Sequence, residues 1–169
     1  MPTASTDAAP ATEPGAGGAR AAALGVVEAF NGGGAEAVDR VFDPAYRSLT
    51  APFPGTDATR EGVKRQIELL RRALPDLRVE TREVIARGDR VYLRWTLEGT
   101  HTGGELLGVP PSGRRVTHYG QELFRLAGGR IVERHGHEDF AELRARLAAA
   151  GDDEGAGGGA ECGVLSAEC

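Results

Sequence analysis

Cysteine, lysine and long apolar runs are scarce in this 169-residue chain. The two cysteines, Cys162 and Cys169, both lie in the last eight residues, so neither disulfides nor a cysteine-based zinc site holds the body of the fold. No apolar run reaches the roughly 18–20 residues of a membrane-spanning helix. The N-terminus also lacks the basic start and apolar core of a signal peptide. We therefore expect a cytoplasmic protein with no membrane partner.

Positive charge is in deficit as well. The chain has 25 acidic and 20 basic residues, which gives a net charge of −5, and Lys64 is its only lysine. Nucleic acids and anionic membranes bind positively charged surfaces. The charge therefore argues against a nucleic-acid partner.

Composition divides the chain into three parts. Residues 1–18 are rich in Ala, Pro, Thr and Gly and carry too little apolar surface to offset the entropy of ordering. Residues 150–169 form a Gly-rich acidic linker and a cysteine-containing tail. We predict that the first segment is disordered and that residues 19–149 form one domain.

The hydrophobic period changes from 3.6 to 2 near residue 77, which predicts helices first and strands afterwards. Helices are predicted at residues 20–30, 35–42, 59–74 and 139–149. Strands are predicted at residues 77–86, 91–99, 115–126 and 130–137, with a short extended piece at 44–51. This order predicts an α+β fold in which helices cover one face of a curved antiparallel sheet.

Three phrases of the sheet half carry a resemblance to a known family. They are A-L-P-D-L-R-V-E from Ala73, R-W-T-L-E-G-T-H-T-G-G-E-L-L-G-V-P-P-S-G-R-R-V from Arg94, and F-R-L-A-G-G-R-I-V-E-R-H from Phe124. In this order and spacing, residues 20–147 resemble the SnoaL-like polyketide cyclase family of the nuclear-transport-factor-2-like superfamily.

The resemblance implies a cone-shaped domain whose sheet wraps around an apolar pocket. Cyclases of this type close polyketide rings by aldol chemistry with an acid/base group in the pocket, and they need no metal or organic cofactor. It also implies a small apolar carbonyl compound as ligand and a homodimer as the assembly.

His118 and Glu122 are the first catalytic candidates, because a base with a pKa near neutrality suits proton abstraction beside a carbonyl. Period 2 places them on one face of their strand with Gly120 and Phe124, and the alternate residues on the other. Only the inward face can line a pocket, and the pattern leaves open which face that is. A surface or dimer-face position is the alternative.

The following strand departs from the family pattern. Family members often carry an acid/base aspartate at the position that aligns with Gly136. His135 or His137 could replace it, although adjacent strand residues point to opposite faces. Asp139 suits a helix N-cap as well as chemistry. The His135-x-His137 pair lacks a clear third ligand, so we predict no metal site.

Four further residues are substrate-binding candidates. Trp95 alternates with apolar residues and is typical of a core or pocket wall, and His101 lies in a long loop where it could gate substrate or face solvent. Tyr119 and Phe124 complete the predicted binding set.

The tail offers a different function. Ser166 lies three residues before Cys169, a spacing that permits a thioether ring after serine dehydration, and Cys162 is a second thiol. The chain is therefore interpreted first as a cyclase-like enzyme or ligand binder. The alternatives are a precursor whose tail is altered by peptide-modifying enzymes, and a dimerising ligand-binding module without catalysis.

Overall fold

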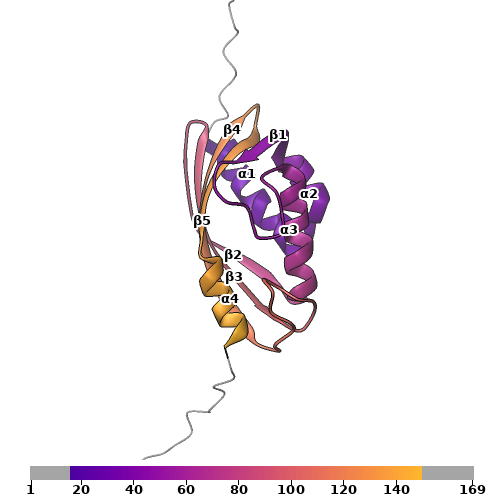
Figure 1. The fold of residues 1–169 in the computed structure, drawn as a ribbon. Coiled ribbons are helices and arrows are strands. Elements are labelled where there is room, and N and C mark those ends of the chain that lie inside the picture. The colour runs from indigo at the N-terminus through magenta and orange to yellow at the C-terminus, as the bar shows by residue number, and fades with distance from the viewer. Residues whose placement is uncertain (1–15, 150–169) are drawn as a thin grey trace, which may run out of the picture.

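The helical and alternating segments form two layers in the computed structural model, which describes residues 16–149 (Figure 1). The helices are α1 (Ala16–Glu28), α2 (Gly34–Val41), α3 (Arg60–Ala73) and α4 (Phe140–Ala148), and a π-helical turn, η1 (Ala29–Gly33), joins the first two. The strands are β1 (Phe42–Ser48), β2 (Arg78–Arg87), β3 (Arg90–Thr100), β4 (Arg115–Ala127) and β5 (Arg130–Glu138). The predicted α+β class is confirmed.

The five strands form one sheet in the order β1-β5-β4-β3-β2. Strands β2 to β5 are an antiparallel meander, as expected, whereas β1 pairs parallel with β5 and makes the sheet mixed. No hairpin joins β1 to β5, since the chain runs from β1 through α3 into β2. The connection therefore does not impose an antiparallel direction on β1.

Local capping signals fix the ends of the helices that flank the site. The Thr59 side chain accepts a hydrogen bond from the Gly62 amide at 3.2 Å and begins α3. Asp139 Oδ1 accepts one from the Glu142 amide at 2.8 Å and begins α4. These are N-cap contacts. Asp139 therefore takes the capping role that its position suggested.

The first helix begins earlier than the sequence suggested. Residues 16–18, assigned to the disordered segment, are the first residues of α1. The rest of that segment and the tail with Cys162, Ser166 and Cys169 lie outside the described residues.

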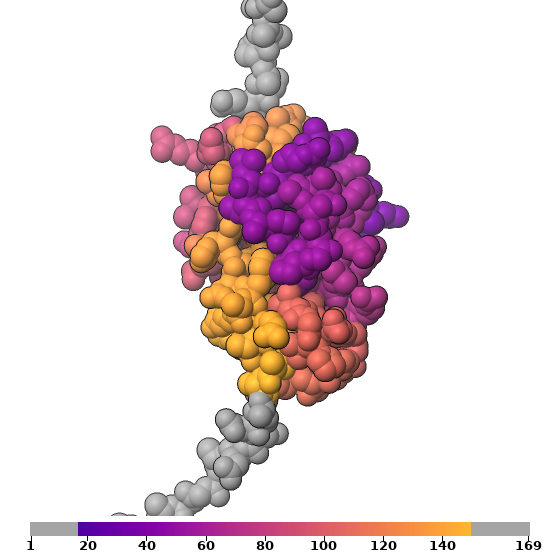
Figure 2. Space-filling model, viewed as in Figure 1, coloured from indigo at the N-terminus to yellow at the C-terminus, as the bar shows by residue number. Residues whose placement is uncertain are grey.

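The core has two apolar clusters between the helices and the sheet. One surrounds Phe42 and Phe124 beneath α1 and α2, and the other surrounds Leu97 beneath the far end of α3 and α4. Trp95 packs against both clusters. In the space-filling view, α4 lies beside the long β3–β4 loop at one end of the molecule (Figure 2), where Arg144 Nε donates to the Leu107 carbonyl at 3.2 Å.

Candidate active site

An apolar cavity of about 60 Å³ lies between the two layers. Helices α1 and α3 form one wall, the sheet forms the other, and the loop before α3 closes one side. Most of the lining is hydrophobic. The polar lining side chains on the sheet are Ser48, Tyr46, His118, Glu122, Arg134 and Glu138.

The structure resolves which face of β4 looks inward. His118 is 2% exposed and Glu122 is 5% exposed, and both line the cavity together with Phe124. Tyr119, on the alternate face, is 55% exposed. The predicted grouping of His118, Glu122 and Phe124 on one face is therefore correct, and that face is the pocket face.

Trp95 lies over Gly120, the residue of β4 between His118 and Glu122. Trp95 and Gly120 are directly paired across the β3–β4 ladder, and a Cβ atom on Gly120 would lie 2.1 Å from Trp95 Cζ2. Only glycine leaves room for the indole there. The ring therefore separates the imidazole from the carboxylate along the pocket floor.

The His118 imidazole has no hydrogen-bond partner on either ring nitrogen among the described residues. Its nearest aromatic neighbours are Trp95, with ring centroids 5.9 Å apart, and Phe140 at 6.5 Å. Burial lowers the pKa of His118, so the ring is neutral at pH 7. A buried, unpaired and uncharged imidazole is an uncommon structural residue but a suitable general base.

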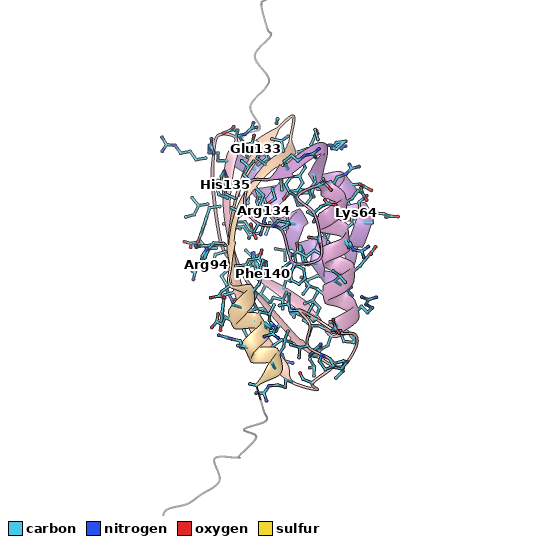
Figure 3. All side chains as sticks on the ribbon, viewed as in Figure 1. Lys64, Arg94, Glu133, Arg134, His135 and Phe140 are labelled. Carbon is cyan, nitrogen blue, oxygen red and sulfur yellow. The ribbon has the colours of Figure 1, made fainter. Side chains whose placement is uncertain are left out.

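A buried ion cluster occupies the neighbouring part of the pocket. Arg134 Nε and Nη2 donate to the two carboxylate oxygens of Glu122 at 2.5 and 2.8 Å, and Nη2 also donates to Glu138 Oε1. The side chains of Arg134, Glu122 and Glu138 are only 12, 6 and 5% exposed. Figure 3 shows Arg134 on the helix side of the sheet, with Arg94 and His135 on the other side.

Burial governs the protonation of this cluster. Desolvation raises the pKa of Glu138 to about 8, and the adjacent Glu122 charge adds to the rise. Burial also raises the pKa of Glu122, against the attraction of Arg134. Arg134 remains cationic, because the charge and hydrogen bonds of Glu122 outweigh its own desolvation and hold its pKa above the usual value. Two carboxyl groups thus share one compensating cation.

Two hydroxyl groups extend the polar end of the pocket. Arg134 Nη1 donates to Ser48 Oγ at 3.3 Å, and the Tyr46 side chain is 1% exposed. Desolvation raises the pKa of Tyr46 to about 12, so its phenol stays protonated and can donate a hydrogen bond.

Gly136, the residue predicted to align with the family's aspartate, lies on the pocket face. It pairs with Glu122 across the β4–β5 ladder. A Cβ atom there would lie 2.2 Å from Arg134 Nη2, so the guanidinium fills the space that a side chain at 136 would take.

Several predicted site residues do not reach the pocket, and for these the predictions are wrong. His135, His137 and Tyr119 are exposed on the outer face of the sheet, because they alternate with the inward residues. His101 is fully buried in its loop, where its ring nitrogens contact Ser112 Oγ at 3.2 Å and the Gly104 carbonyl at 2.9 Å. It neither faces solvent nor lines the cavity.

Arg134 and Glu138 are the pocket residues that the sequence reasoning missed. The signal was present, since Arg134, Gly136 and Glu138 alternate on one face of β5, the face that Gly136 shares with Glu122. Among residues 16–149 no cluster of three or more His, Cys, Asp or Glu side chains has a geometry that could bind a metal ion. None of the helices in this range has the length and apolar composition needed to cross a bilayer.

A curved sheet packed against helices around an apolar pocket is the architecture of this protein, and comparison with known proteins identifies its class. The chain belongs to the SnoaL-like polyketide cyclase family, whose model matches residues 20–147. It is 28% identical over 135 residues to nogalonic acid methyl ester cyclase of Streptomyces nogalater, covering 77% of this chain and 98% of that enzyme.

Solved structures support the same fold. TsrD from Streptomyces laurentii superposes with a TM-score of 0.70 at 24% identity, covering 79% of this chain and 97% of its own, and shows the fold alone. IdmH from Streptomyces antibioticus, a proposed polyketide cyclase, has a TM-score of 0.63 at 29% identity. The superposition covers 76% of this chain and 97% of the IdmH chain. These comparisons give no support to the precursor or non-catalytic interpretations.

Proposed function

We propose that this protein is an acid/base cyclase that closes a ring in a neutral, apolar, polyketide-like carbonyl compound. The observation that carries this proposal is His118, a buried neutral imidazole facing an apolar cavity with both ring nitrogens unpaired among the described residues. A ligand that offers a polarised C–H or an O–H group would supply the missing partner. Family membership supports the reaction class.

The reaction needs only groups of the substrate and the chain. An unprotonated ring nitrogen of His118 takes a proton from the carbon beside one carbonyl. The resulting enolate carbon attacks a second carbonyl carbon, and one C–C bond forms as the C=O π bond opens. The new alkoxide takes a proton from an acid in the pocket. The product is an isomer of the substrate, so no oxidant, reductant or leaving group is involved.

The polar end of the pocket suits the acceptor carbonyl. Tyr46 and the carboxyl cluster lie beyond Trp95, away from His118, so a flat ligand over the indole would contact the base at one end and hydrogen-bond donors at the other. Donors fixed at the site where negative charge develops lower the barrier of such additions.

The test uses nogalonic acid methyl ester, the compound in the name of the curated relative. We expect the wild-type protein to convert it to an isomer of equal mass, measured by chromatography and mass spectrometry. Trp95 is the only tryptophan of the chain and lines the pocket, so its fluorescence reports binding separately. His118→Gln should retain binding and lose roughly 10²–10⁴-fold in kcat. Equal kcat in His118→Gln, or no binding and no conversion by wild type, contradicts the proposal.

Domain boundaries, dimerisation and cellular location remain predictions. We propose that the domain, which begins with α1 at Ala16, forms a homodimer in the cytoplasm. Sedimentation equilibrium tests the dimer, since a monomer at micromolar concentration would contradict it.

A further inference from the structure

The contacts of Arg134 with its two carboxyl partners are unequal. Glu122 receives a two-point fork, in which each of its oxygens accepts one N–H group of the guanidinium. Glu138 receives a single contact, through Oε1 alone. Forked guanidinium–carboxylate pairs are the stronger ones and favour the ionised acid. Glu122 is therefore the anion of the cluster, and Glu138 has one oxygen that Arg134 does not bind.

The charge balance of the cluster leads to the same assignment. With both acids ionised, one cation would face two anions in a region where the three side chains are at most 12% exposed. A buried carboxylate without its own counter-charge is costly and takes up a proton instead. One proton therefore belongs to the pair, and the contact pattern places it on Glu138.

Glu138 also lies on the pocket face of β5. It follows Gly136 by two residues on the same face of β5, and it lines the cavity. Across the ladder it pairs with Gly120, the residue covered by Trp95. The two glycines on the pocket face thus leave space for the Arg134 guanidinium and for the indole, and Glu138 contacts the guanidinium.

We propose that Glu138 is the catalytic acid of the pocket, with Glu122 and Arg134 as positioning residues. This inference rests on the proposed function. Glu138 gives its proton to the alkoxide oxygen that forms in the addition, and its carboxylate is left beside Arg134. After product release, the proton taken up by His118 returns to Glu138 through water, so the cycle closes without another reactant.

The charged and titratable groups around Glu138 are few. Arg134 lies on its own strand, Glu122 on β4 and Tyr46 on β1. Tyr46 stays neutral over the relevant range because its pKa is about 12. A pH dependence near 8 therefore reports the Glu122–Glu138 pair.

Infrared spectroscopy locates the proton without requiring turnover. The wild-type protein at pH 6.5 should show the C=O band of a protonated buried carboxyl group, and the band should fade as pH rises through about 8. Glu138→Gln should lose this band. Glu133→Gln is the matched control, because Glu133 lies on the same strand but pairs with Arg125 outside the pocket. A wild-type protein without the band, or a band that persists in Glu138→Gln, overturns the assignment.

Kinetics with nogalonic acid methyl ester test the catalytic role. We expect Glu138→Gln to bind the ester with an affinity within about 3-fold of wild type and to lose at least about 100-fold in kcat. Glu122→Gln should move the alkaline fall of kcat to lower pH, because Glu138 then becomes the single anion beside Arg134. A Glu138→Gln protein that retains kcat within about 10-fold overturns the acid role.

The two proposals fail in different ways. A wild-type protein that does not convert the ester removes the proposed function and, with it, the acid role. Conversion that needs His118 but is insensitive to Glu138→Gln keeps the proposed function and removes the inference.

Discussion

Gly136 of β5 lies opposite Glu122 of β4, so close that a Cβ atom at position 136 would come within 2.4 Å of Glu122 Oε2. The same atom would collide with the Arg134 guanidinium. Glycine at this position is therefore a condition for the Glu122–Arg134–Glu138 cluster. The absence of a side chain at position 136 and the presence of the buried ion cluster are therefore two aspects of one arrangement.

Gly136→Ala should disturb this cluster. Because the guanidinium is held between two carboxyl groups and is only 12% exposed, it cannot move aside freely, and we expect a loss of about 1–3 kcal/mol in the free energy of unfolding. Gly17→Ala is the control, since nothing lies within 4 Å of its added methyl group; it should be neutral or stabilising by up to about 1 kcal/mol. Equal stability of the two variants in urea titrations would contradict the account.

Two buried histidines should respond to the same substitution in opposite ways. His118→Leu removes an imidazole whose nitrogens are unpaired, so the free energy of unfolding should stay equal or rise by up to about 2 kcal/mol. His101→Leu removes two hydrogen bonds within the loop and should cost about 1–3 kcal/mol. Denaturant titration measures both. A larger loss for His118→Leu than for His101→Leu would show that the imidazole is structural.

The sequence predicts which residues of β4 share a face, but not which face lines the pocket. Period 2 correctly grouped His118, Glu122 and Phe124, because a strand alternates its faces whatever the sheet packs against. It could not choose the inward face, since both faces of β4 carry polar and aromatic residues. That choice follows from where α1 and α3 pack. The hydrogen bonds of His101 depend on a loop conformation that no period encodes.

The missed residues have a related explanation. Arg134 and Glu138 are charged, and charged residues on a strand are usually solvated. Their burial depends on three strands at once: Glu122 on β4, the glycine between them on β5, and Ser48 on β1, which contacts Arg134. The parallel pairing of β1 with β5 was itself not foreseen.

Stability should depend on pH in a direction set by Glu138. The pKa of Glu138 is about 8 in the folded protein, against 4.5 for an ordinary glutamate. Between these values the folded state binds more protons than the unfolded state, so the free energy of unfolding falls as pH rises. His118, with its lowered pKa, acts oppositely below pH 6.5. The pKa of Glu122 is also raised, so this group acts in the same direction as Glu138. We therefore expect the free energy of unfolding to fall between pH 6.5 and 8.

Denaturant titrations at several pH values measure this fall. Glu138→Gln should flatten the dependence of stability on pH. Glu133→Gln should leave it unchanged, because the Glu133–Arg125 pair is partly exposed and its hydrogen bond lowers the pKa of Glu133. A wild-type protein whose stability rises between pH 6.5 and 8 would contradict the protonation assigned to the pair.

The pocket should prefer a neutral ligand. Arg134 is the only arginine or lysine among its lining residues in the described part of the chain, and two acids already contact it. A ligand carboxylate would be a further anion without a partner. Nogalonic acid methyl ester should therefore bind at least about 10-fold more tightly than its free acid at pH 8, or about 1.4 kcal/mol. Trp95 fluorescence measures both affinities, and tighter binding of the acid would contradict the charge balance.

Deuterium exchange tests the division between base and acid most directly. The ester is incubated in D₂O with wild type, His118→Gln or Glu138→Gln, and mass spectrometry follows deuterium in the unreacted ester and in the cyclised product. Proton abstraction by His118 and protonation by Glu138 predict that Glu138→Gln exchanges the ester without closing the ring, whereas His118→Gln does neither. Exchange by His118→Gln at the wild-type rate would contradict the account.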